Sequence, residues 1–560
     1  MAALPFDRLP LSRYGSWLAV SLGEDGLPLI RDIHGGDYGA PWIFRIRFAD
    51  HDPLDLRCGL RPAALEAVSR KDGSRLGIVC GGHDDLYLRA EGLSVILETR
   101  QERYNSLIPL DGGEYEYQLY AINRKIRLRG SASGGGIVEF HSQWKISESA
   151  GVFITLDGRK GRAGLDLQSY AVTPEFPFSD YDHEKEAGAN HFAGWTAPLP
   201  AGGEYAEAAK YTLWGNFVHA EGALGYDALY MNKLSMTNIW SWDNCFSAIA
   251  LAKAHPQRAL EQLLVILDHQ HSSGALPDYV NDLFASYSCV KPPVYGWTVQ
   301  KLREQNDFFY GKEVSALLYD KISKLTAFWL ERRMRREWGL CYYLHGNDSG
   351  WDNASVFHRS PPLCGADLAA YLTRQMDALS EMAAGLEKPA EAALWKERAE
   401  AMFNAMIERL HTPDGFVSRG LNSGEADGEA KSLINLLPLL VHYRMEASMK
   451  ESLVRRLEEF EGEHGLATER LDSRYYRKGG YWLGPIWAPV SLLFIDSLYS
   501  AGYGGMAARL AEKFRRLPST GLMAENFDPQ TGQGYDGNAF AWTAAVYLFL
   551  EKYGGGPKDA

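Results

Sequence analysis

Two short acidic segments, far apart in the chain, carry the residue types that sugar chemistry needs. Residues 345–354 read HGNDSGWDNA, and residues 524–529 read AENFDP. Both lie beside expected helices, and both are too polar for a packed core and too rich in carboxylates and rings for a simple linker. Hydrolysis of a glycosidic bond uses two carboxyl groups, one to protonate the leaving oxygen and one to activate water. We therefore predict a glycoside hydrolase.

The composition agrees with a carbohydrate substrate. Aromatic residues make up 12% of the 560 residues, including 15 Trp and 30 Tyr. Aromatic faces stack on the C–H faces of sugars, although most of these rings are expected in the core of a large protein. The predicted partner is an oligosaccharide or a small glycoside.

Charge and hydropathy argue against other classes of partner. The net charge is −13, whereas binding to nucleic acid needs a basic face. No apolar run reaches the ~18 residues of a membrane span, no Lys/Arg block points to an anionic membrane, and the first ten residues lack the pattern of a signal peptide. The six cysteines are scattered, without a CxxC pair, as is typical of free thiols in a reducing compartment. We predict a cytoplasmic enzyme that binds neither nucleic acid nor membrane, and no pattern indicates its oligomeric state.

Residues 1–200 carry the pattern of β-strands. Short runs rich in β-branched and aromatic residues are separated by turns of Gly, Asp and Asn. The runs span residues 42–48, 75–80, 93–97, 115–120, 125–129, 137–140 and 152–156. Many short strands without a helical pattern between them predict an antiparallel β-sandwich.

Residues 201–560 carry a helical period instead, with apolar residues at three- and four-residue spacing. The predicted helices lie near 204–218, 242–254, 256–270, 296–306, 312–335, 365–386, 388–410, 428–443, 446–461, 484–501, 502–516 and 538–553. Very short connections alternate with long aromatic loops, which places the long loops at one end of a closed ring. Six helical hairpins of this kind form an (α/α)6 barrel. An open α-solenoid is the alternative, but it should show an internal sequence repeat, and none is visible.

The long loops hold clusters of polar and aromatic residues, as loops on a rigid scaffold do at functional sites. The clusters lie at 240–244, 278–282, 291–297, 347–353, 479–487 and 525–536. Asp243 also stands where a helix begins, and capping that helix could be its only role.

Five segments, in this order, resemble glycoside hydrolase family 63, the family of processing α-glucosidase I and of bacterial mannosylglycerate and glucosylglycerate hydrolases. They are 240–246 (WSWDNCF), 291–293 (KPP), 349–353 (SGWDN), 481–487 (YWLGPIW) and 525–529 (ENFDP). The resemblance spans about 240–545 and implies an inverting hydrolase of α-glucosides or related α-linked sugars. The N-terminal half carries no motif of the family.

Carried over by position, the resemblance implies that Asp352 is the general acid and Glu525 the general base. Inversion needs room for a water molecule, so the two carboxyl groups should stand roughly 6.5–9.5 Å apart. Burial against Trp351 would help Asp352 to keep its proton. Asp348 is the alternative acid and Asp528 the alternative base, although both positions are typical of residues that brace a turn.

The sugar being cleaved is expected to contact side chains of the same loops. The candidates are Trp240, Asp243, Lys291, Trp297, Trp351, Tyr481, Trp482, Gly484 and Trp487. The family often has Gln where Lys291 stands and Arg where Leu483 stands, so these departures affect the expected sugar preference. Residues 180–192 are expected to form a loop that reaches the mouth of the site.

Two other classes of function stay open. One is another sugar enzyme on the same barrel: a trehalase, an α-L-rhamnosidase, a debranching glucosidase or a lyase. The trehalase pattern is missing from residues 483–489, which read LGPIWAP. The other is a non-catalytic carbohydrate-binding protein, which is less favoured because a binder has no need of two acidic loops.

No metal or cofactor is predicted. The sequence contains no HExxH, P-loop or EF-hand pattern. His269 and His271, two residues apart near the end of a predicted helix, are typical of ordinary polar residues. No histidines lie at the spacing of metal ligands.

Overall fold

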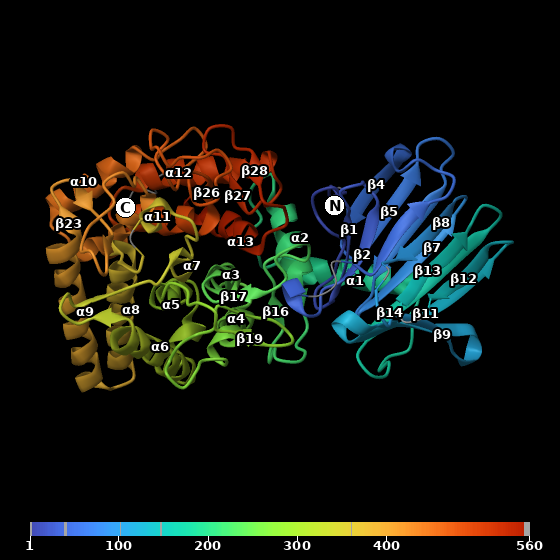
Figure 1. Ribbon diagram of the computed structural model, residues 1–560, viewed down its shortest axis with the longest axis horizontal. Helices are drawn as coiled ribbons and strands as arrows, with labels where there is room; N and C mark the ends of the chain where they lie inside the picture. Colours follow the sequence, from blue (N-terminus) through green and yellow to red (C-terminus); the bar gives the residue numbers. More distant parts are fainter. Residues whose placement is uncertain (1–2, 39–41, 101, 146–147, 360, 554–560) are drawn as a thin grey trace. The chain divides into compact units, whose positions relative to one another are not determined.

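The computed structural model describes residues 3–38, 42–100, 102–145, 148–359 and 361–553 (Figure 1). Contacts between residues divide the chain into two compact units. The first, here called the β-unit, comprises residues 1–198, 210–238 and 281–283. The second, here called the helical unit, comprises residues 199–209, 239–280 and 284–560.

The β-unit contains two antiparallel sheets, in the strand orders β1-β2-β3-β8-β13-β12 and β4-β5-β6-β7-β14-β11-β10-β9 (Figure 1). The six-stranded sheet consists of β1 Leu18–Leu22, β2 Pro28–Asp32, β3 Phe44–Phe48, β8 Ser94–Thr99, β12 Ile137–Lys145 and β13 Glu148–Asp157. The eight-stranded sheet consists of β4 Leu56–Arg61, β5 Ala64–Ser69, β6 Arg75–Cys80, β7 Asp85–Glu91, β9 Ser106–Pro109, β10 Glu114–Leu119, β11 Arg124–Ser133 and β14 Arg162–Tyr170. Strand β13 of one sheet contacts β14 and β7 of the other. Each segment predicted as a strand overlaps a strand of one of these sheets.

Strand β11 shows why these segments are strands. Ile126 and Leu128 are completely buried, while Lys125 and Arg127 alternate with them and stay partly exposed. Side chains that alternate between core and solvent suit an antiparallel sheet with one covered face.

The prediction of a loop over residues 180–192 is wrong, because this segment lies in the helix α1 Tyr181–Thr196. The carboxylate of Asp180 accepts hydrogen bonds from the backbone N–H groups of Asp182 and His183. These bonds satisfy donors that the first turn of a helix otherwise leaves unpaired. The suggested approach of this segment to the sugar site stays a prediction.

The helical unit is built largely from helical hairpins. Its helices are α3 Asp243–Leu251, α4 Pro256–Leu267, α5 Tyr295–Arg303, α6 Lys312–Arg332, α7 Gly346–Ser349, α8 Ala366–Gly385, α9 Pro389–Leu410, α10 Ala447–Glu458, α11 Ala488–Ser500, α12 Gly504–Arg516 and α13 Ala541–Phe549. Most of α2 Ala206–Asn216 belongs to the β-unit. Helix α3 packs against α4, α8 against α9, and α11 against α12. Helix α13 packs against α3, so the last helix of the chain meets an early one.

One predicted α-helix, at residues 428–443, has a different form. The chain there makes the 3₁₀ helix η7 Leu433–Arg444, which contains Pro438 and a non-helical residue, Val441. Proline lacks the N–H that an α-helix needs and clashes with the carbonyl of the preceding turn. The apolar period therefore predicts a helix correctly, but not the type of helix.

Short strand pairs tie the long loops together at the ends of helices. Trp240 in β17 Ile239–Trp240 pairs with Tyr279 in β18 Tyr279–Val280. Trp487 in β26 Ile486–Trp487 pairs with Asn526 in β27 Asn526–Phe527. The second pairing brings the start of α11 next to the acidic segment 524–529.

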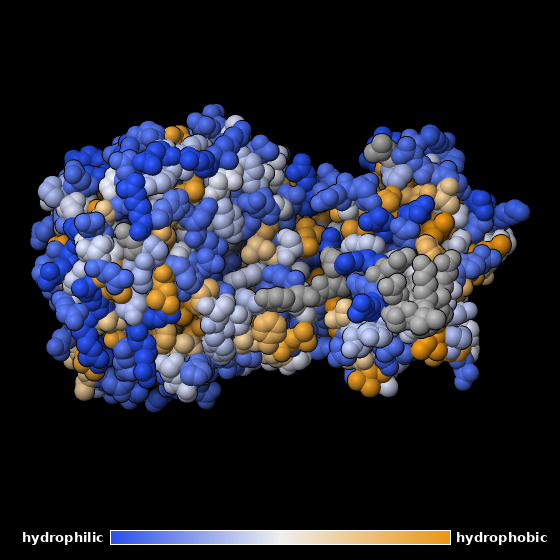
Figure 2. All heavy atoms as spheres, viewed as in Figure 1, coloured by the Kyte–Doolittle hydropathy of each residue, from blue (hydrophilic) through white to orange (hydrophobic). Residues whose placement is uncertain are grey.

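The visible face of the helical unit is mostly hydrophilic, with apolar side chains scattered over it (Figure 2). Single apolar side chains on a surface are ordinary in globular proteins. None of the helices in the described part of the chain combines the length and the apolar character needed to cross a membrane.

Candidate active site

The two predicted catalytic carboxyl groups lie in one electrostatic cluster. Glu525 directly precedes β27 and is only 3% exposed. Asp352 follows α7 and is partly exposed. The charge on Asp352 raises the pKa of Glu525, and Asp243 at the start of α3 interacts with both groups. The helical unit therefore brings together carboxyl groups from three distant segments.

A tight turn after α7 sets the direction of the chain at Asp352. Gly350 ends α7 with a φ of 71°, a conformation that favours glycine. A Cβ atom at this position would stand 2.7 Å from a ring carbon of Trp242, so a larger residue would not fit. The turn buries Trp351 completely and leaves the next residue, Asp352, closer to solvent.

A stack of buried indoles supports the site. The rings of Trp482 and Trp487 are 3.9 Å apart and nearly parallel, at 6°. Trp351 lies against Trp482 at 4.9 Å. Asn353 ties the two loops together, because its side chain accepts from the backbone N–H of Trp482 and donates to the carbonyl of Gly480, at 2.9 and 3.1 Å. These two hydrogen bonds therefore fix the segment 345–354 to the 479–487 loop.

Lys291 is the cation of the cluster. Its ammonium lies 3.3 Å from Asp278 and donates a hydrogen bond to the carbonyl of Asn347 at 3.0 Å. Burial alone would lower the pKa of Lys291. The negative charges of Asp278, Asp352 and Asp243 outweigh this effect, so the pKa of Lys291 is raised overall. Lys291 therefore stays charged among the acidic groups.

Burial raises the pKa of three carboxyl groups of the cluster, Asp352, Asp243 and Glu525. It raises the pKa of Asp352, against the opposing charge of Lys291. It raises the pKa of Asp243 to about 7. Burial, together with the charge of Asp536, also raises the pKa of Glu525 to about 8, although a hydrogen bond from Tyr481 opposes this change. Such shifts are common among catalytic groups.

The two alternative carboxylates both brace the chain. Asp348 is completely buried and accepts hydrogen bonds from the backbone N–H groups of Val290 and Leu344. It also forms an ion pair with Arg333. Asp528 accepts from the backbone of Gln530 and Thr531 and from the hydroxyl of Tyr535. The contacts of Asp528 are those of a turn-forming residue, whereas Asp348 joins segments that lie apart in the chain.

Asp243 does not cap α3, contrary to the simplest explanation of its position. The residue before the helix is Trp242, and no side chain caps this end. Asp243 is 3% exposed, and its Oδ2 atom has no hydrogen-bond partner among the described residues. Buried carboxylate oxygens are usually paired, so this atom is available to a ligand.

The remaining candidates differ in their surroundings. Trp240 is partly exposed and lies 5.8 Å from the ring of Tyr279. Gly484 has a φ of 147°, and a Cβ atom there would come within 2.6 Å of the ring of Tyr476. Trp297 is buried in α5 and donates its indole N–H to Asp496. The proposed contacts of all three with sugar stay predictions.

The motifs do not indicate the roles of Asp278, Asn353 and Asp536. Asp278 and Asn353 lie in segments that the sequence singled out, but neither was given a function. Asp536 accepts a hydrogen bond from Asn526 at 2.8 Å and acts on Glu525 through its charge. The signal for Asp536 was its place in the same loop as Glu525, eleven residues later.

Comparisons with known proteins agree with the motifs. The family model described as the mannosylglycerate hydrolase MGH1-like glycoside hydrolase domain matches residues 236–543. The mannosylglycerate hydrolase of Thermus thermophilus is 24% identical over 391 residues, which cover 55% of this chain and 93% of that protein.

Solved structures show the same fold. A family 63 mannosylglycerate hydrolase from Thermus thermophilus, in complex with glucose, has a TM-score of 0.53 at 23% identity and covers 62% of this chain and 100% of its own. A bacterial glucoamylase complexed with acarbose has a TM-score of 0.67 at 11% identity and covers 99% and 94%. The family model spans more than half of the chain, and the protein therefore belongs to the mannosylglycerate hydrolase-like glycoside hydrolases of family 63, inverting enzymes that act on α-linked glycosides, as its motifs predicted.

Proposed function

We propose that this hydrolase cleaves a small α-linked hexoside, with Asp352 as the general acid and Glu525 as the general base. The observation that carries the proposal is the electrostatic coupling of these two carboxyl groups within one site. The hydroxyl of Tyr481 also contacts Glu525 at 3.1 Å. Burial and the charges of Glu525 and Asp352 raise the pKa of Tyr481. The match to mannosylglycerate hydrolases supports a small glycoside as substrate.

In the proposed reaction, Asp352 gives its proton to the glycosidic oxygen as the bond from that oxygen to the anomeric carbon breaks. Water attacks the anomeric carbon from the opposite face, and Glu525 takes the proton that the water loses. The aglycone leaves as an alcohol, and the sugar leaves with inverted configuration.

The proton on Glu525 must be lost before Glu525 can act as a base. Its pKa of about 8 means that Glu525 is mostly protonated in the empty enzyme at neutral pH. The productive form, with Asp352 protonated and Glu525 ionised, is then a minor form near pH 7. The hydrogen bond from Tyr481 favours that form, because it stabilises the carboxylate.

Some aromatic residues of the site support the loops, and others are placed to contact the sugar. Trp482 and Trp487 are 1% and 0% exposed and already cover each other's faces. Trp240 and Tyr481 keep partly exposed rings, which suits them to stack on a sugar. The unpaired Oδ2 atom of Asp243 is suited to accept a hydrogen bond from a sugar hydroxyl.

The proposed scaffold of the site is an (α/α)6 barrel over residues 201–560, behind a β-sandwich over residues 1–200. The hairpin pairs, and the packing of α13 on α3, support closure of the ring. A cytoplasmic location also stays part of the proposal and is supported by six unpaired cysteines.

The test is hydrolysis of a panel of α-glucosides and α-mannosides, including glucosylglycerate and mannosylglycerate, followed by proton NMR. The first-formed sugar should be the β-anomer, and Asp352→Asn and Glu525→Gln should each lower kcat by about 10²- to 10⁴-fold. Full activity of either folded variant would remove that residue from its role, and an initial α-anomer would exclude direct displacement by water.

A further inference from the structure

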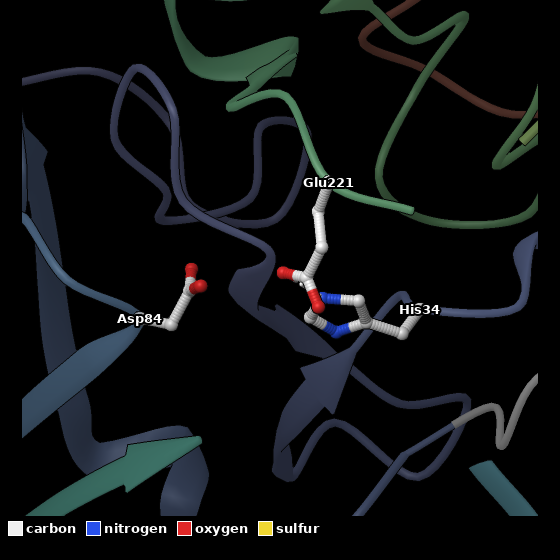
Figure 3. A group of neighbouring side chains, drawn as sticks. All are labelled: His34, Asp84 and Glu221. Carbon is white, nitrogen blue, oxygen red and sulfur yellow. Dashed lines mark hydrogen bonds and ion pairs between the residues drawn. The ribbon is translucent and has the colours of Figure 1, made fainter. Parts of the chain in front are cut away.

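Four potential metal ligands converge within the β-unit. His34 follows β2, Asp84 directly precedes β7, and His219 and Glu221 follow β15 Phe217–Val218. Figure 3 shows His34, Asp84 and Glu221 approaching one another from three separate segments. Ligand atoms of these three residues all lie within 4.8 Å of one another.

Three distances between ligand atoms of the cluster are close to those around a shared ion. Oε2 of Glu221 lies 3.2 Å from Nε2 of His34 and 3.5 Å from Nε2 of His219. Nε2 of His219 lies 3.6 Å from Oδ2 of Asp84. Around a tetrahedral zinc ion, bonds of 2.0–2.2 Å place neighbouring ligand atoms about 3.4 Å apart.

Both imidazoles are oriented by an acceptor on their other nitrogen. Nδ1 of His34 lies 2.5 Å from the carboxylate of Asp32. Nδ1 of His219 lies 2.7 Å from the carbonyl oxygen of Gly15, which can only accept. A proton on each Nδ1 leaves Nε2 free to bind a metal, and such outer partners are a regular feature of histidine ligands.

Both carboxylates are anchored in the same manner. Oδ1 of Asp84 accepts from the backbone N–H of Trp17 at 2.6 Å. Oε1 of Glu221 accepts from the guanidinium of Arg124 at 2.5 Å. In each case the second oxygen is the one that faces the histidines.

The net charge of the cluster also favours binding of a cation. With both imidazoles neutral, four carboxylates (Asp32, Asp84, Glu221 and Asp282) interact with two cations, the guanidinium of Arg124 and the ammonium of Lys233. This excess of two negative charges is what one divalent ion would neutralise. Protons on the two Nε2 atoms are the competing solution, and binding of a metal would release them.

We propose that the β-unit binds one divalent transition-metal ion of the zinc class through Nε2 of His34, Nε2 of His219, Oδ2 of Asp84 and Oε2 of Glu221. Two imidazoles with two carboxylates suit zinc better than calcium or magnesium, which prefer oxygen ligands alone. Four protein ligands make a closed, structural site. The ion ties the segments that follow β2 and β15 to the turn before β7. A cavity of about 600 Å³, lined in part by Asp84, His219 and Glu221, gives it a path of entry.

The test uses the full chain, treated with a chelator, dialysed and titrated with zinc chloride alone. We expect one zinc per chain by elemental analysis after gel filtration, and a higher Tm in the presence of zinc, since the ion binds only the folded state. Cobalt in place of zinc should give the visible absorption of a tetrahedral site.

His34→Ala and His219→Ala should each weaken zinc binding by at least about tenfold. The matched control is His83→Ala, which removes an imidazole that lines the same cavity and stacks on Phe176. This control should bind zinc as the native chain does. Folding of each variant is checked by circular dichroism, and Glu221→Gln, nearly the same shape, replaces any variant that does not fold.

Two results would overturn the proposal. One is a native chain that retains no zinc after gel filtration, which would leave the cluster as a protonated ion-pair network. The other is unchanged zinc affinity in the folded His34, His219 or Glu221 variants. Neither result depends on hydrolytic activity, so the proposed catalytic roles stand or fall separately.

Discussion

The hydroxyl of Tyr481 donates a hydrogen bond to Oε1 of Glu525 over 3.1 Å, and it links two loops that are 44 residues apart. Tyr481 adopts a φ of 63°, a left-handed conformation that costs free energy for any residue with a side chain. Such conformations persist where the surroundings enforce them, and here Trp487 holds the carbonyl of Tyr481 through its indole N–H. The 479–487 loop thus delivers a donor to the proposed base.

Replacing Tyr481 by Phe should raise the pKa of Glu525, because the hydrogen bond favours the ionised form. The limb of the kcat/KM profile that the ionisation of Glu525 controls should therefore move to higher pH. At neutral pH the activity should fall about tenfold or more, as expected for loss of a hydrogen bond to a charged group.

The control for this change is Tyr475→Phe. Tyr475 donates to the carboxylate of Asp427 over the same 3.1 Å, but neither residue belongs to the carboxylate cluster. Its profile should match that of the native enzyme. An unchanged kcat/KM profile in Tyr481→Phe would mean that Glu525 is not a group whose ionisation controls the rate.

Replacing Lys291 by Met should destabilise the fold. The side chains of Lys291 and Asp278 are 8% and 10% exposed, and removal of one partner leaves a buried charge unpaired, at a cost of about 3–5 kcal/mol. The exposed pair of Lys431 and Asp472 provides the comparison, since Lys431→Met should cost less than about 1 kcal/mol. Urea denaturation of both variants measures the difference. Equal losses would show that Lys291 is not held as a buried ion pair.

Replacing Asp348 by Asn should lower the free energy of unfolding but leave most of kcat. The carboxylate of Asp348 is completely buried and accepts from Arg333 and from two backbone N–H groups. Loss of its charge leaves the guanidinium poorly compensated, whereas the proposed acid, Asp352, is intact. We expect a clear drop in the free energy of unfolding with most of kcat kept at low temperature. Loss of kcat without loss of stability would make Asp348 the better candidate for the acid.

The free energy of unfolding should depend on pH through the protonation state of Asp243. Burial raises the pKa of Asp243 to about 7 in the folded state, against about 4 in the unfolded chain. Its contribution to stability is therefore fully present below about pH 4 and is lost as the pH rises through 7. Because Asn does not titrate, Asp243→Asn should show a smaller fall in urea midpoint between pH 5 and pH 8 than the native chain. The exposed control Asp320→Asn should keep the native dependence, and the same dependence in Asp243→Asn would contradict a protonated Asp243.

Local patterns in the sequence were enough to predict most elements of the fold. Ile126 and Leu128 alternate with Lys125 and Arg127, so β11 could be recognised without any contact partner. The helix type of residues 433–444 and the presence of α1 were missed for opposite reasons. Pro438 changes the form of a strongly apolar helix, whereas α1 shows no clear apolar face and depends on its cap at Asp180.

Relations between distant side chains were harder to predict. The ordered motifs identified Asp352 and Glu525 as candidates, but the donors that surround Asp348 come from segments with no motif in common. The cluster around Glu221 shows the same limit, since His34 is 187 residues away in the chain. No spacing rule links such residues, because folding alone brings them together.

The most direct test of the catalytic pair compares two α-glycosides of the same sugar, one with an alkyl aglycone and one with a dinitrophenyl aglycone. The alkyl group must be protonated to leave, and the dinitrophenyl group need not be. Asp352→Asn should therefore lose about 10²- to 10⁴-fold in kcat/KM on the alkyl glycoside and far less on the dinitrophenyl glycoside, while Glu525→Gln should lose equally on both. Recovery of Glu525→Gln, and not of Asp352→Asn, on the dinitrophenyl glycoside would contradict the assignment and reverse the two roles.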